Sequence, residues 1–251
     1  MQVGYEGRIG RYSTSLAVAF LEFVDIEAGS RALDVGCGPG ALTAQLAARL
    51  GPERVAAVDP ATEDVITCRG RLPGVDVREA AAEALPFLDG AFDVVAAQLV
   101  VALLADPAVG VGEMRRVART GGTVAACSWD FADGMRVLRA FWDAAVVRDP
   151  SVRTRDPAGK PASTAPALRA LFEGAGLRFV ATGELTAHAD YADFDNLWES
   201  LVAPDGPPGV YWAGLVAADR SAVRDDVWRR LGSPAGAFGL TARAWSVRGI
   251  A

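Results

Sequence analysis

The sequence is short of lysine, histidine and cysteine, and each shortage narrows the chemistry to be expected. The only lysine of the 251 residues is Lys160, in a proline-rich stretch, so no Ser…Tyr-x-x-x-Lys proton-relay set is present. The only histidine is His188. The cysteines are odd in number and include no CxxC pair, which argues against a disulfide framework and against a cysteine metal site. They are Cys37, Cys68 and Cys127.

Long apolar runs and an excess of basic residues are also absent. No stretch reaches about 18 uninterrupted apolar residues, and Glu6, Glu22 and Asp25 interrupt the first 30 residues, so neither a membrane span nor a signal peptide is expected. The net charge of −6 would repel phosphate backbones. With 51% apolar residues the chain can bury a core. We therefore expect a soluble, cytoplasmic protein without a metal and without a nucleic-acid or membrane partner.

Short apolar runs alternate with helical patterns from residue 31 to residue 127. These runs lack the polar alternation of a half-exposed strand, which indicates strands buried on both faces of a parallel sheet. Right-handed crossovers then give a doubly wound α/β sheet, with its ligand site beyond the carboxyl ends of the strands. Strands are expected at residues 31–35, 54–58, 75–78, 92–98 and 123–127, and helices at 39–50, 61–69 and 109–118, the last closed by a Thr-Gly-Gly turn at 120–122.

The segments on either side of this region are expected to be mainly helical. Residues 1–30 are interpreted as an amphipathic helical lid. Its apolar face contains Leu16, Phe20, Leu21 and Val24. Residues 192–232 are interpreted as a helical cap inserted before the last strand, within a main domain that covers residues 31–251. Between these segments we expect helices at 134–147 and 167–174, a loop at 148–166, an extended stretch at 177–188, and a terminal strand at 240–247.

The most specific feature is a glycine loop that joins the first expected strand to the next helix. It reads Leu33-Asp34-Val35-Gly36-Cys37-Gly38-Pro39-Gly40. Glycines at such a junction let backbone N–H groups approach a ligand, and the helix N-terminus favours negative charge. Asp59 ends the second expected strand, where a carboxylate can accept hydrogen bonds from both hydroxyls of a ribose. Each feature also has a purely structural interpretation, the glycines as a tight turn and Asp59 as a helix N-cap.

Two classes of ligand fit this loop. Gly36, Gly38 and Ala41 satisfy the Gly-x-Gly-x-x-Gly/Ala pattern of dinucleotide sites. Asp34, however, lies two residues before the first glycine. A carboxylate at that position suits a ligand with a cationic amino group better than it suits a pyrophosphate.

Further segments favour the ligand with a cationic amino group over a dinucleotide. Val-Asp-Pro stands at 58–60, AAAEALPFLDGAFDVV at 80–95, and EMRRVARTGGTVA at 113–125. With the glycine loop, these motifs resemble class I S-adenosylmethionine (SAM)-dependent methyltransferases, in particular the UbiE-like small-molecule branch. The resemblance is close over residues 31–130. It implies a Rossmann-like methyltransferase fold with a mostly parallel seven-stranded sheet, and SAM as the cofactor.

The resemblance also implies a set of cofactor contacts. Asp34 and the backbone of residues 36–40 would hold the methionyl part of SAM, and Asp59 would bind the ribose. Many relatives have Gly-Asp where this chain has Ala80 and Ala81, so adenine is expected to be read by backbone or by Glu83, unless Glu83 is only a solvated charge. The full set of implied cofactor residues is Arg11, Asp34, Gly36, Cys37, Gly38, Pro39, Gly40, Asp59, Pro60, Ala82, Glu83, Gln98 and Leu99.

The reaction implied by the resemblance is a direct displacement, in which a lone pair of the acceptor attacks the sulfonium methyl group and S-adenosylhomocysteine leaves. Tyr12 and His188 are the candidates for a catalytic base, and a surface or packing role is favoured for His188. Trp129 follows the carboxyl end of the fifth strand, so we expect Tyr12, Trp129 and Phe131 to bind the acceptor. The acceptor is expected to be a small apolar or aromatic metabolite.

Two other functions stay open at this point. An NAD-dependent oxidoreductase would use the same glycines, and a SAM-binding enzyme of a non-methylating reaction type, or a regulator, would carry the same motifs. The sequence also leaves open whether the chain forms a homodimer and which atom of the acceptor is methylated.

Overall fold

The computed structural model describes residues 9–160, 162–204 and 206–251. Expectations that fall on residues 1–8, which are part of the expected lid, lie outside the described residues. The described residues fall into two compact units. The sheet unit contains those of residues 16–129, 162–185 and 244–251, and the helical unit contains those of residues 9–15, 130–160 and 186–243.

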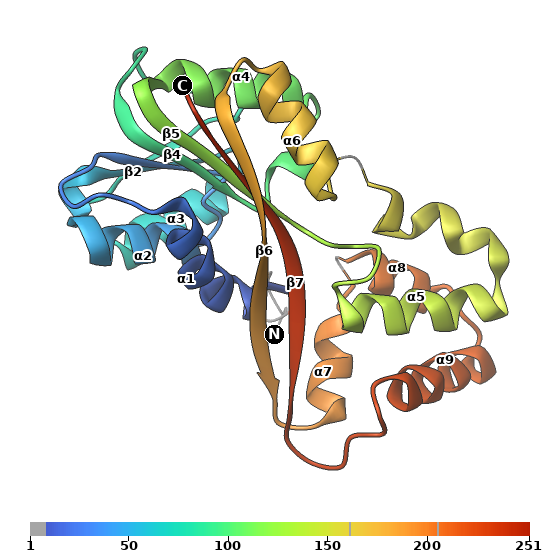
Figure 1. The fold of residues 1–251 in the computed structure, drawn as a ribbon. Coiled ribbons are helices and arrows are strands. Elements are labelled where there is room, and N and C mark those ends of the chain that lie inside the picture. Colours follow the sequence, from blue (N-terminus) through green and yellow to red (C-terminus); the bar gives the residue numbers. More distant parts are fainter. Residues whose placement is uncertain (1–8, 161, 205) are drawn as a thin grey trace. The chain divides into compact units, whose positions relative to one another are not determined.

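The described residues include one seven-stranded sheet, with strand order β3-β2-β1-β4-β5-β7-β6 (Figure 1). The strands β1 to β5 pair in parallel, and β7 pairs antiparallel with β5, from Thr123 opposite Ile250 to Trp129 opposite Ala244. The doubly wound, mostly parallel fold class is therefore confirmed. The strands are β1 (Ala32–Val35), β2 (Val55–Asp59), β3 (Asp76–Glu79), β4 (Phe92–Gln98), β5 (Ala118–Trp129), β6 (Arg178–Tyr191) and β7 (Phe238–Ile250).

Helices cover both faces of the sheet, and β1 and β2 are therefore buried along their whole length. In Figure 1, α4 and α6 lie on one face and α2 and α3 on the other. The helices are α1 (Ser13–Val24), α2 (Ala41–Leu50), α3 (Thr62–Arg71), α4 (Pro107–Val117), α5 (Arg136–Arg148), α6 (Ala165–Gly174), α7 (Phe194–Leu201), α8 (Pro207–Ala213) and α9 (Ala217–Arg230). Short 3-10 turns occur at Ile9–Tyr12, Pro52–Arg54, Val101–Leu103, Pro150–Arg155 and Pro157–Gly159.

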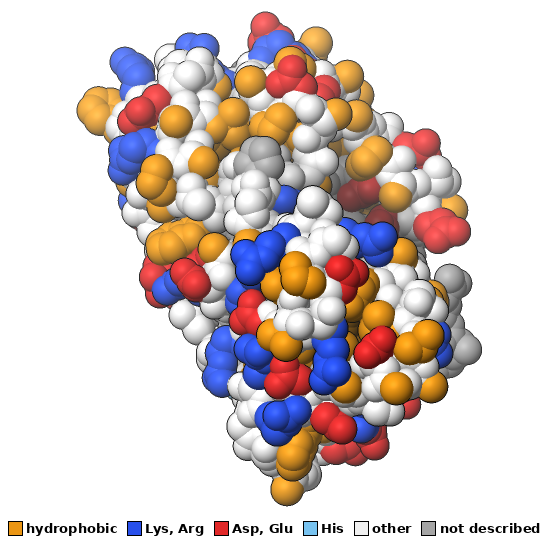
Figure 2. All heavy atoms as spheres, turned by 90° about the vertical axis from the view of Figure 1, so that its right-hand side faces the viewer, with side chains coloured by type: hydrophobic (Ala, Val, Ile, Leu, Met, Phe, Trp, Pro, Cys, Tyr) orange, Lys and Arg blue, Asp and Glu red, His pale blue; other side chains and the backbone are white. Residues whose placement is uncertain are grey.

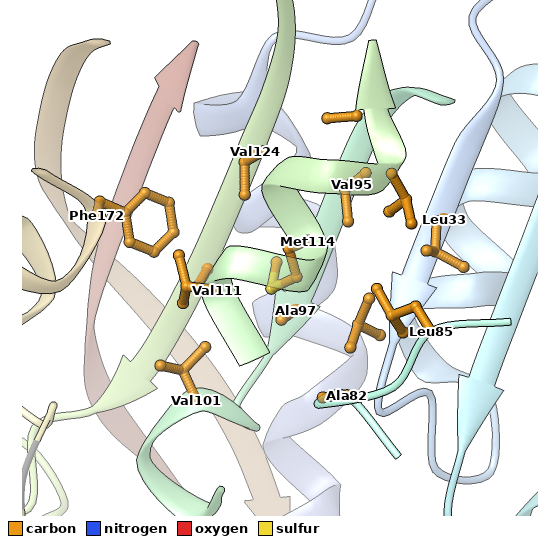
Figure 3. Close-up of a cluster of buried hydrophobic side chains, with 14 of the residues drawn as sticks. Leu33, Ala82, Leu85, Val95, Ala97, Val101, Val111, Met114, Val124 and Phe172 are labelled. Carbon is orange, nitrogen blue, oxygen red and sulfur yellow. The ribbon is translucent and has the colours of Figure 1, made fainter. Parts of the chain in front are cut away.

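The main core of the sheet unit lies between the sheet and the pair α4 and α6. Figure 3 shows side chains from the strands, among them Leu33, Val95 and Val124, facing Met114 of α4 and Phe172 of α6. Neighbouring residues of one strand point to opposite faces, so Ala57 belongs to a second cluster with Val65 and Cys68 of α3. The two apolar layers fix the register of β1 and β2, and thereby the place where each strand ends.

The helix after the glycine loop begins two residues later than expected. The sequence pattern predicts a helix from Pro39, whereas α2 starts at Ala41 because Gly40, with φ of 100°, forms its N-cap. The face that carries Leu42, Leu46 and Leu50 is buried, as the spacing of four residues requires. The glycine loop is therefore longer than predicted, because Pro39 and Gly40 belong to it and not to the helix.

The helical unit contains α5, α7, α8 and α9. In the sequence, α7, α8 and α9 lie between β6 and β7. The helical unit is larger than the segment 192–232, because α5 packs against α9 and against the turn Pro150–Arg155. Aromatic rings fill its interior, including Phe141 and Trp142, whose ring centroids are 5.3 Å apart. Lys/Arg and Asp/Glu side chains are interspersed on the face drawn in Figure 2.

A partly buried ion pair joins Asp130 to Arg243 in the helical unit. Asp130 is buried, and its Oδ2 accepts hydrogen bonds from Nε and Nη2 of Arg243, at 2.8 and 2.6 Å. Its Oδ1 accepts from the backbone N–H groups of Ala132 and Asp133. The carboxylate is thus satisfied on both oxygens, which is what a buried charge requires.

The expectation of a separate turn at 120–122 is wrong. The strand β5 already begins at Ala118, and Gly121, with φ of 77°, forms an irregularity inside it. The N–H of Gly121 donates to the carbonyl of Ala251, and the N–H of Ala251 donates to the carbonyl of Gly122. Pairing with the end of the chain therefore extends the strand through the two glycines.

Among the described residues, no helix combines the length and the apolar character that crossing a bilayer would need.

Candidate functional site

The glycine loop lies at the carboxyl end of β1, next to the carboxyl ends of β2 and β4. Gly36 has φ of 73°, and a Cβ added there would lie 2.3 Å from Cγ2 of Val100. The N–H groups of Gly36 and Cys37 both donate to the carbonyl of Val58, at 2.8 and 2.9 Å. Only glycine therefore fits at position 36, where the loop is held against β2.

Gly38, unlike Gly36, has open space on the side where a side chain would lie. Its φ is 51°, and a Cβ added there would meet nothing within 4 Å. Its N–H donates to Oδ2 of Asp59, at 2.8 Å. The loop is therefore tied to β2 on one side and open on the other, which is the shape that a ligand-binding backbone loop requires.

Asp34 is the most unusual residue of the site, because its carboxyl group is fully buried beneath the loop. Its Oδ2 accepts a hydrogen bond from Oγ1 of Thr43, at 2.6 Å. Its Oδ1 is buried and has no hydrogen-bond partner within the described part of the chain. Burial, together with the nearby carboxylate of Asp59, raises the pKa of Asp34 to about 7. A cationic group that bonded Oδ1 would satisfy it and favour the charged form.

Asp59 ends β2 and is largely buried, with 8% of its surface exposed. Besides Gly38, it accepts from the N–H of Ala61, which bonds Oδ1 at 2.9 Å. Ala61, not Asp59, is the N-cap residue of α3, so the alternative role of Asp59 as the N-cap itself is wrong. A carboxylate has about four acceptor positions, so two remain for other donors, such as the two hydroxyls of a ribose.

Backbone strain marks the carboxyl end of β4. Leu99 has φ of 67°, which is rare for a branched side chain, and its N–H donates to the carbonyl of Cys127 at 2.9 Å. Gln98 is half-buried and lies opposite Cys127 in the parallel pairing. Strained conformations of this kind are concentrated at binding sites.

The residues expected near the adenine have different environments. Pro60 is exposed, Glu83 is half-buried, and Ala82 is buried in the core with Leu85 and Val111. Of the loop residues, Pro39 is half-buried and Gly40 is buried, close to the thiol of Cys68.

Cys37 of the loop, Cys68 of α3 and Cys127 of β5 are free and buried. Cys37 and Cys68 share a hydrogen bond, which together with burial raises the pKa of the Cys37 thiol above its ordinary value. The thiol of Cys68 donates to Oγ1 of Thr43 at 4.0 Å, and burial raises the pKa of Cys127. Among the described residues, no group of three or more ligating side chains could hold a metal ion.

Arg11, Tyr12 and His188 lie in the helical unit. The guanidinium of Arg11 donates to Oδ1 of Asn196 at 2.8 Å and lies over the ring of Tyr191. Tyr12 is buried, and its hydroxyl accepts from that of Tyr191 at 3.4 Å. Burial raises the pKa of Tyr12 well above its ordinary range. A hydroxyl that stays protonated can donate a hydrogen bond but is a poor base.

His188 is a surface residue of the helical unit. Its side chain is 52% exposed, and Nε2 lies 2.8 Å from Oδ1 of Asp190. Its backbone N–H donates to the hydroxyl of Ser15, which in turn donates to the carbonyl of His188. The structure therefore gives this histidine a local packing role and an exposed hydrogen bond to Asp190.

Trp129 and Phe131, two of the three aromatic residues predicted to bind the acceptor, are the chain neighbours of Asp130. Trp129 is the last residue of β5 and is 3% exposed, in the sheet unit. Phe131 belongs to the helical unit and is 9% exposed. The ammonium of Lys160, an exposed residue, lies 5.9 Å from the centroid of the Phe131 ring.

Sequence reasoning missed two residues of the site. Thr43 holds Asp34, and the available signal was a hydroxyl three residues after the glycine loop, on a helix face of leucines. Val100 excludes a side chain at Gly36, and no pattern in the sequence connects these two positions.

Part of the chain is similar to a known protein family. Residues 33–126 match the family described as methyltransferase domain. Over 93% of this chain and 97% of the other, the fold superposes with a TM-score of 0.61 on a Bacillus halodurans protein assigned as a methyltransferase, at 16% identity.

Two curated relatives are methyltransferases by name. The 2-methyl-6-phytyl-1,4-hydroquinone methyltransferase of Synechocystis is 28% identical over 71% of this chain and 56% of its own length. The ubiquinone/menaquinone biosynthesis C-methyltransferase UbiE of Stenotrophomonas maltophilia is 33% identical over 41% of this chain and 44% of its own. The chain thus spans about half the length of these relatives. The resemblance to the UbiE-like small-molecule branch of class I SAM-dependent methyltransferases is confirmed.

Proposed function

We propose that the sheet unit binds SAM and that the protein transfers a methyl group from it to a small apolar or aromatic acceptor. The observation that carries this proposal is Oδ1 of Asp34, a fully buried carboxylate oxygen with no hydrogen-bond partner among the described residues. An unsatisfied buried carboxylate is costly, and a ligand with an ammonium group would offset that cost. The amino group of the methionyl part of SAM supplies this chemistry, whereas a pyrophosphate would repel the carboxylate.

The other residues present fit the same cofactor. Asp59 has unused acceptor positions for the ribose hydroxyls, and the space beside Gly38 lets a ligand approach the loop backbone. Leu99 and Gln98, at the end of β4, are proposed to close the site below the sulfonium. Arg11, Pro60, Ala82 and Glu83 keep the cofactor roles that the resemblance implies.

When bound, SAM supplies a methyl group already activated by its sulfonium charge, so the protein needs no strong acid or base. Asp34 would fix the amino end of the cofactor, and Asp59 the ribose end, so that the methyl group has one orientation. Alignment of this kind contributes up to about 7–11 kcal/mol in the best intramolecular reactions. Tyr12, whose raised pKa keeps its hydroxyl protonated, would orient an acceptor by donating a hydrogen bond.

The acceptor class is inferred from the relatives. One acts by name on a prenylated hydroquinone and another belongs to quinone biosynthesis, so substituted hydroquinones are the first acceptors to test. We propose that Tyr12, Trp129 and Phe131 contact this acceptor, and that residues 1–30 and 192–232 act as lid and cap.

Calorimetric titration with SAM and, separately, with NAD tests the proposal, because a dinucleotide site and a SAM site share the glycine pattern. Binding of SAM alone is the expected result. Incubation with methyl-labelled SAM, first with substituted hydroquinones and then with a metabolite extract, should move the label to an acceptor. Binding of NAD without SAM would refute the cofactor assignment, and SAM binding without any label transfer would favour a non-methylating function.

A further inference from the structure

Thr43 is a buried polar residue on a helix face that is otherwise apolar. It is the third residue of α2 and fully buried, and its neighbours on that face are Leu42, Leu46 and Leu50. A threonine has a lower helix propensity than leucine, and a buried hydroxyl needs a partner. The partner here is Oδ2 of Asp34, 2.6 Å away. Such a short hydrogen bond to a carboxyl group is stronger than one between neutral groups.

The hydroxyl of Thr43 is itself oriented by a second donor. The thiol of Cys68, on α3, donates to Oγ1 of Thr43 at 4.0 Å. A hydroxyl that accepts from Cys68 directs its own hydrogen elsewhere, here to Asp34. Residues from α3, α2 and β1 thereby form one chain of donors that ends at a single oxygen of the carboxyl group.

Without Thr43, the surroundings of Asp34 would favour its neutral form. The titratable groups that interact with it are Asp59 of β2, Cys37 and Cys68, and Cys127 of β5. Asp59 raises the pKa of Asp34, as burial does, whereas the hydroxyl and the backbone N–H of Thr43 lower it. Thr43 therefore opposes both the desolvation and the charge of the neighbouring carboxylate.

We propose that Thr43 is a positioning residue for the cofactor: its hydroxyl holds Oδ2 of Asp34, so that Oδ1 is presented, in the charged form, to the cationic amino group. This inference rests on the proposed function. Thr43 touches Asp34 rather than the cofactor, so its effect must depend on the ionisation of Asp34. A residue that only filled space would change affinity by the same factor at every pH.

The expected size of the effect follows from the acidity of Asp34. Loss of one hydrogen bond to a carboxylate makes it about a tenfold weaker acid. With a wild-type pKa of about 7, half of Asp34 is ionised at pH 7. After a tenfold loss of acidity only about one molecule in eleven is ionised, so the dissociation constant for SAM should rise about fivefold at pH 7. At pH 9 both proteins are almost fully ionised, and the difference should fall to less than about twofold.

The variant that tests this is Thr43→Val, which keeps the branched shape and removes the hydroxyl. Thr43→Ser keeps the hydroxyl and should restore the wild-type pH profile. The matched control is Thr67→Val on α3, because the hydroxyl of Thr67 is exposed and donates only to the backbone carbonyl of Glu63. Calorimetry with SAM from pH 6 to pH 9 measures the dissociation constants, and the ionisation of the cofactor's own amino group cancels between variants.

A second measurement does not need the cofactor. Carbon-13 NMR of the carboxyl groups, with Asp34→Asn used to assign the signal of Asp34, gives its titration midpoint in the ligand-free protein. The midpoint should move to higher pH in Thr43→Val and stay near the wild-type value in Thr43→Ser and Thr67→Val. Should Thr43→Val fail to fold, Thr43→Ala tests the same loss of the hydroxyl.

Two results would overturn the role of Thr43: an unchanged midpoint in Thr43→Val, or a loss of SAM affinity that is equal at pH 7 and pH 9. If wild-type protein binds no SAM at any pH, the proposed function fails, and with it the positioning role. The NMR midpoint then still shows whether Thr43 controls Asp34.

Discussion

The charge of Asp34 should act in opposite directions on folding and on cofactor binding. Its folded-state pKa, about 7, lies above its ordinary value of 3.8, so between these values the folded protein holds a proton that the unfolded chain has lost. Stability contributed by the neutral group is therefore full below about pH 4 and is lost as pH rises to 7. The difference of about three pKa units corresponds to about 4 kcal/mol, as an order of magnitude.

Asp34→Asn removes this charge and should separate the two effects. The amide oxygen can still accept from Thr43, but the buried NH₂ group costs about 1–3 kcal/mol if it finds no partner. Above pH 7 the variant should therefore unfold with a free energy about 1–3 kcal/mol higher than that of the wild type. At pH 5 part of the stability from the neutral group is already lost, because Asp34 of the unfolded chain is ionised, so the two proteins should differ by no more than about 1 kcal/mol. Affinity for SAM should fall at every pH above 7, because no carboxylate faces the amino group.

Urea unfolding at pH 5 and pH 8, followed by tryptophan fluorescence, measures the first effect, and calorimetry with SAM measures the second. Asp93→Asn is a suitable control, because Asp93 pairs with Arg119 near the surface and this contact lowers its pKa. It should give no gain of stability at pH 8. Parallel pH profiles for wild type and Asp34→Asn would refute a raised pKa at Asp34. An unchanged SAM dissociation constant would remove its carboxylate from the site.

Further substitutions test other parts of the site. Asp59→Ala should weaken SAM binding by about 1–3 kcal/mol in calorimetry and also lower the unfolding free energy, because two backbone N–H groups lose their acceptor. Gly36→Ala should destabilise the protein by about 2–4 kcal/mol in urea unfolding, since it adds a strained φ and a clash with Val100; a second change, Val100→Ala, should recover only the clash. Trp129→Ala and Phe131→Ala should each raise the KM for the acceptor while the SAM dissociation constant stays the same. If a variant raised the KM for the acceptor and the SAM dissociation constant by the same factor, an acceptor role for that residue would be contradicted.

Much of the sheet unit could be predicted, because its sequence signals are local. The β4 bounds at 92–98 match the structure, and β1 and β2 differ by one residue at their ends, since a run of apolar residues bounded by glycine or proline defines a buried strand. The spacing of Leu16, Phe20 and Val24 predicted a buried helix face, and all three are buried in α1.

The structure differs from the sequence-based predictions where contacts between residues far apart in the sequence decide the conformation. Residues 120–122 join β5 only because the end of the chain pairs with them, which the local sequence cannot show. The helical unit combines segments from both sides of β6, so no continuous stretch of sequence could define it. Asp34 was recognised by its place before the glycines, but its unpaired oxygen and its raised pKa depend on its full burial in the folded protein, which the local sequence does not show.

The single lysine gives this protein a useful chemical handle. An amine-selective reagent such as a succinimidyl ester can modify only one side chain, Lys160, which is exposed and lies 5.9 Å from the ring of Phe131. A fluorescent dye coupled there would report on the surroundings of that ring without any engineered labelling position. Libraries of hydroquinones and other compounds could then be screened by emission changes, before any product of catalysis has to be detected.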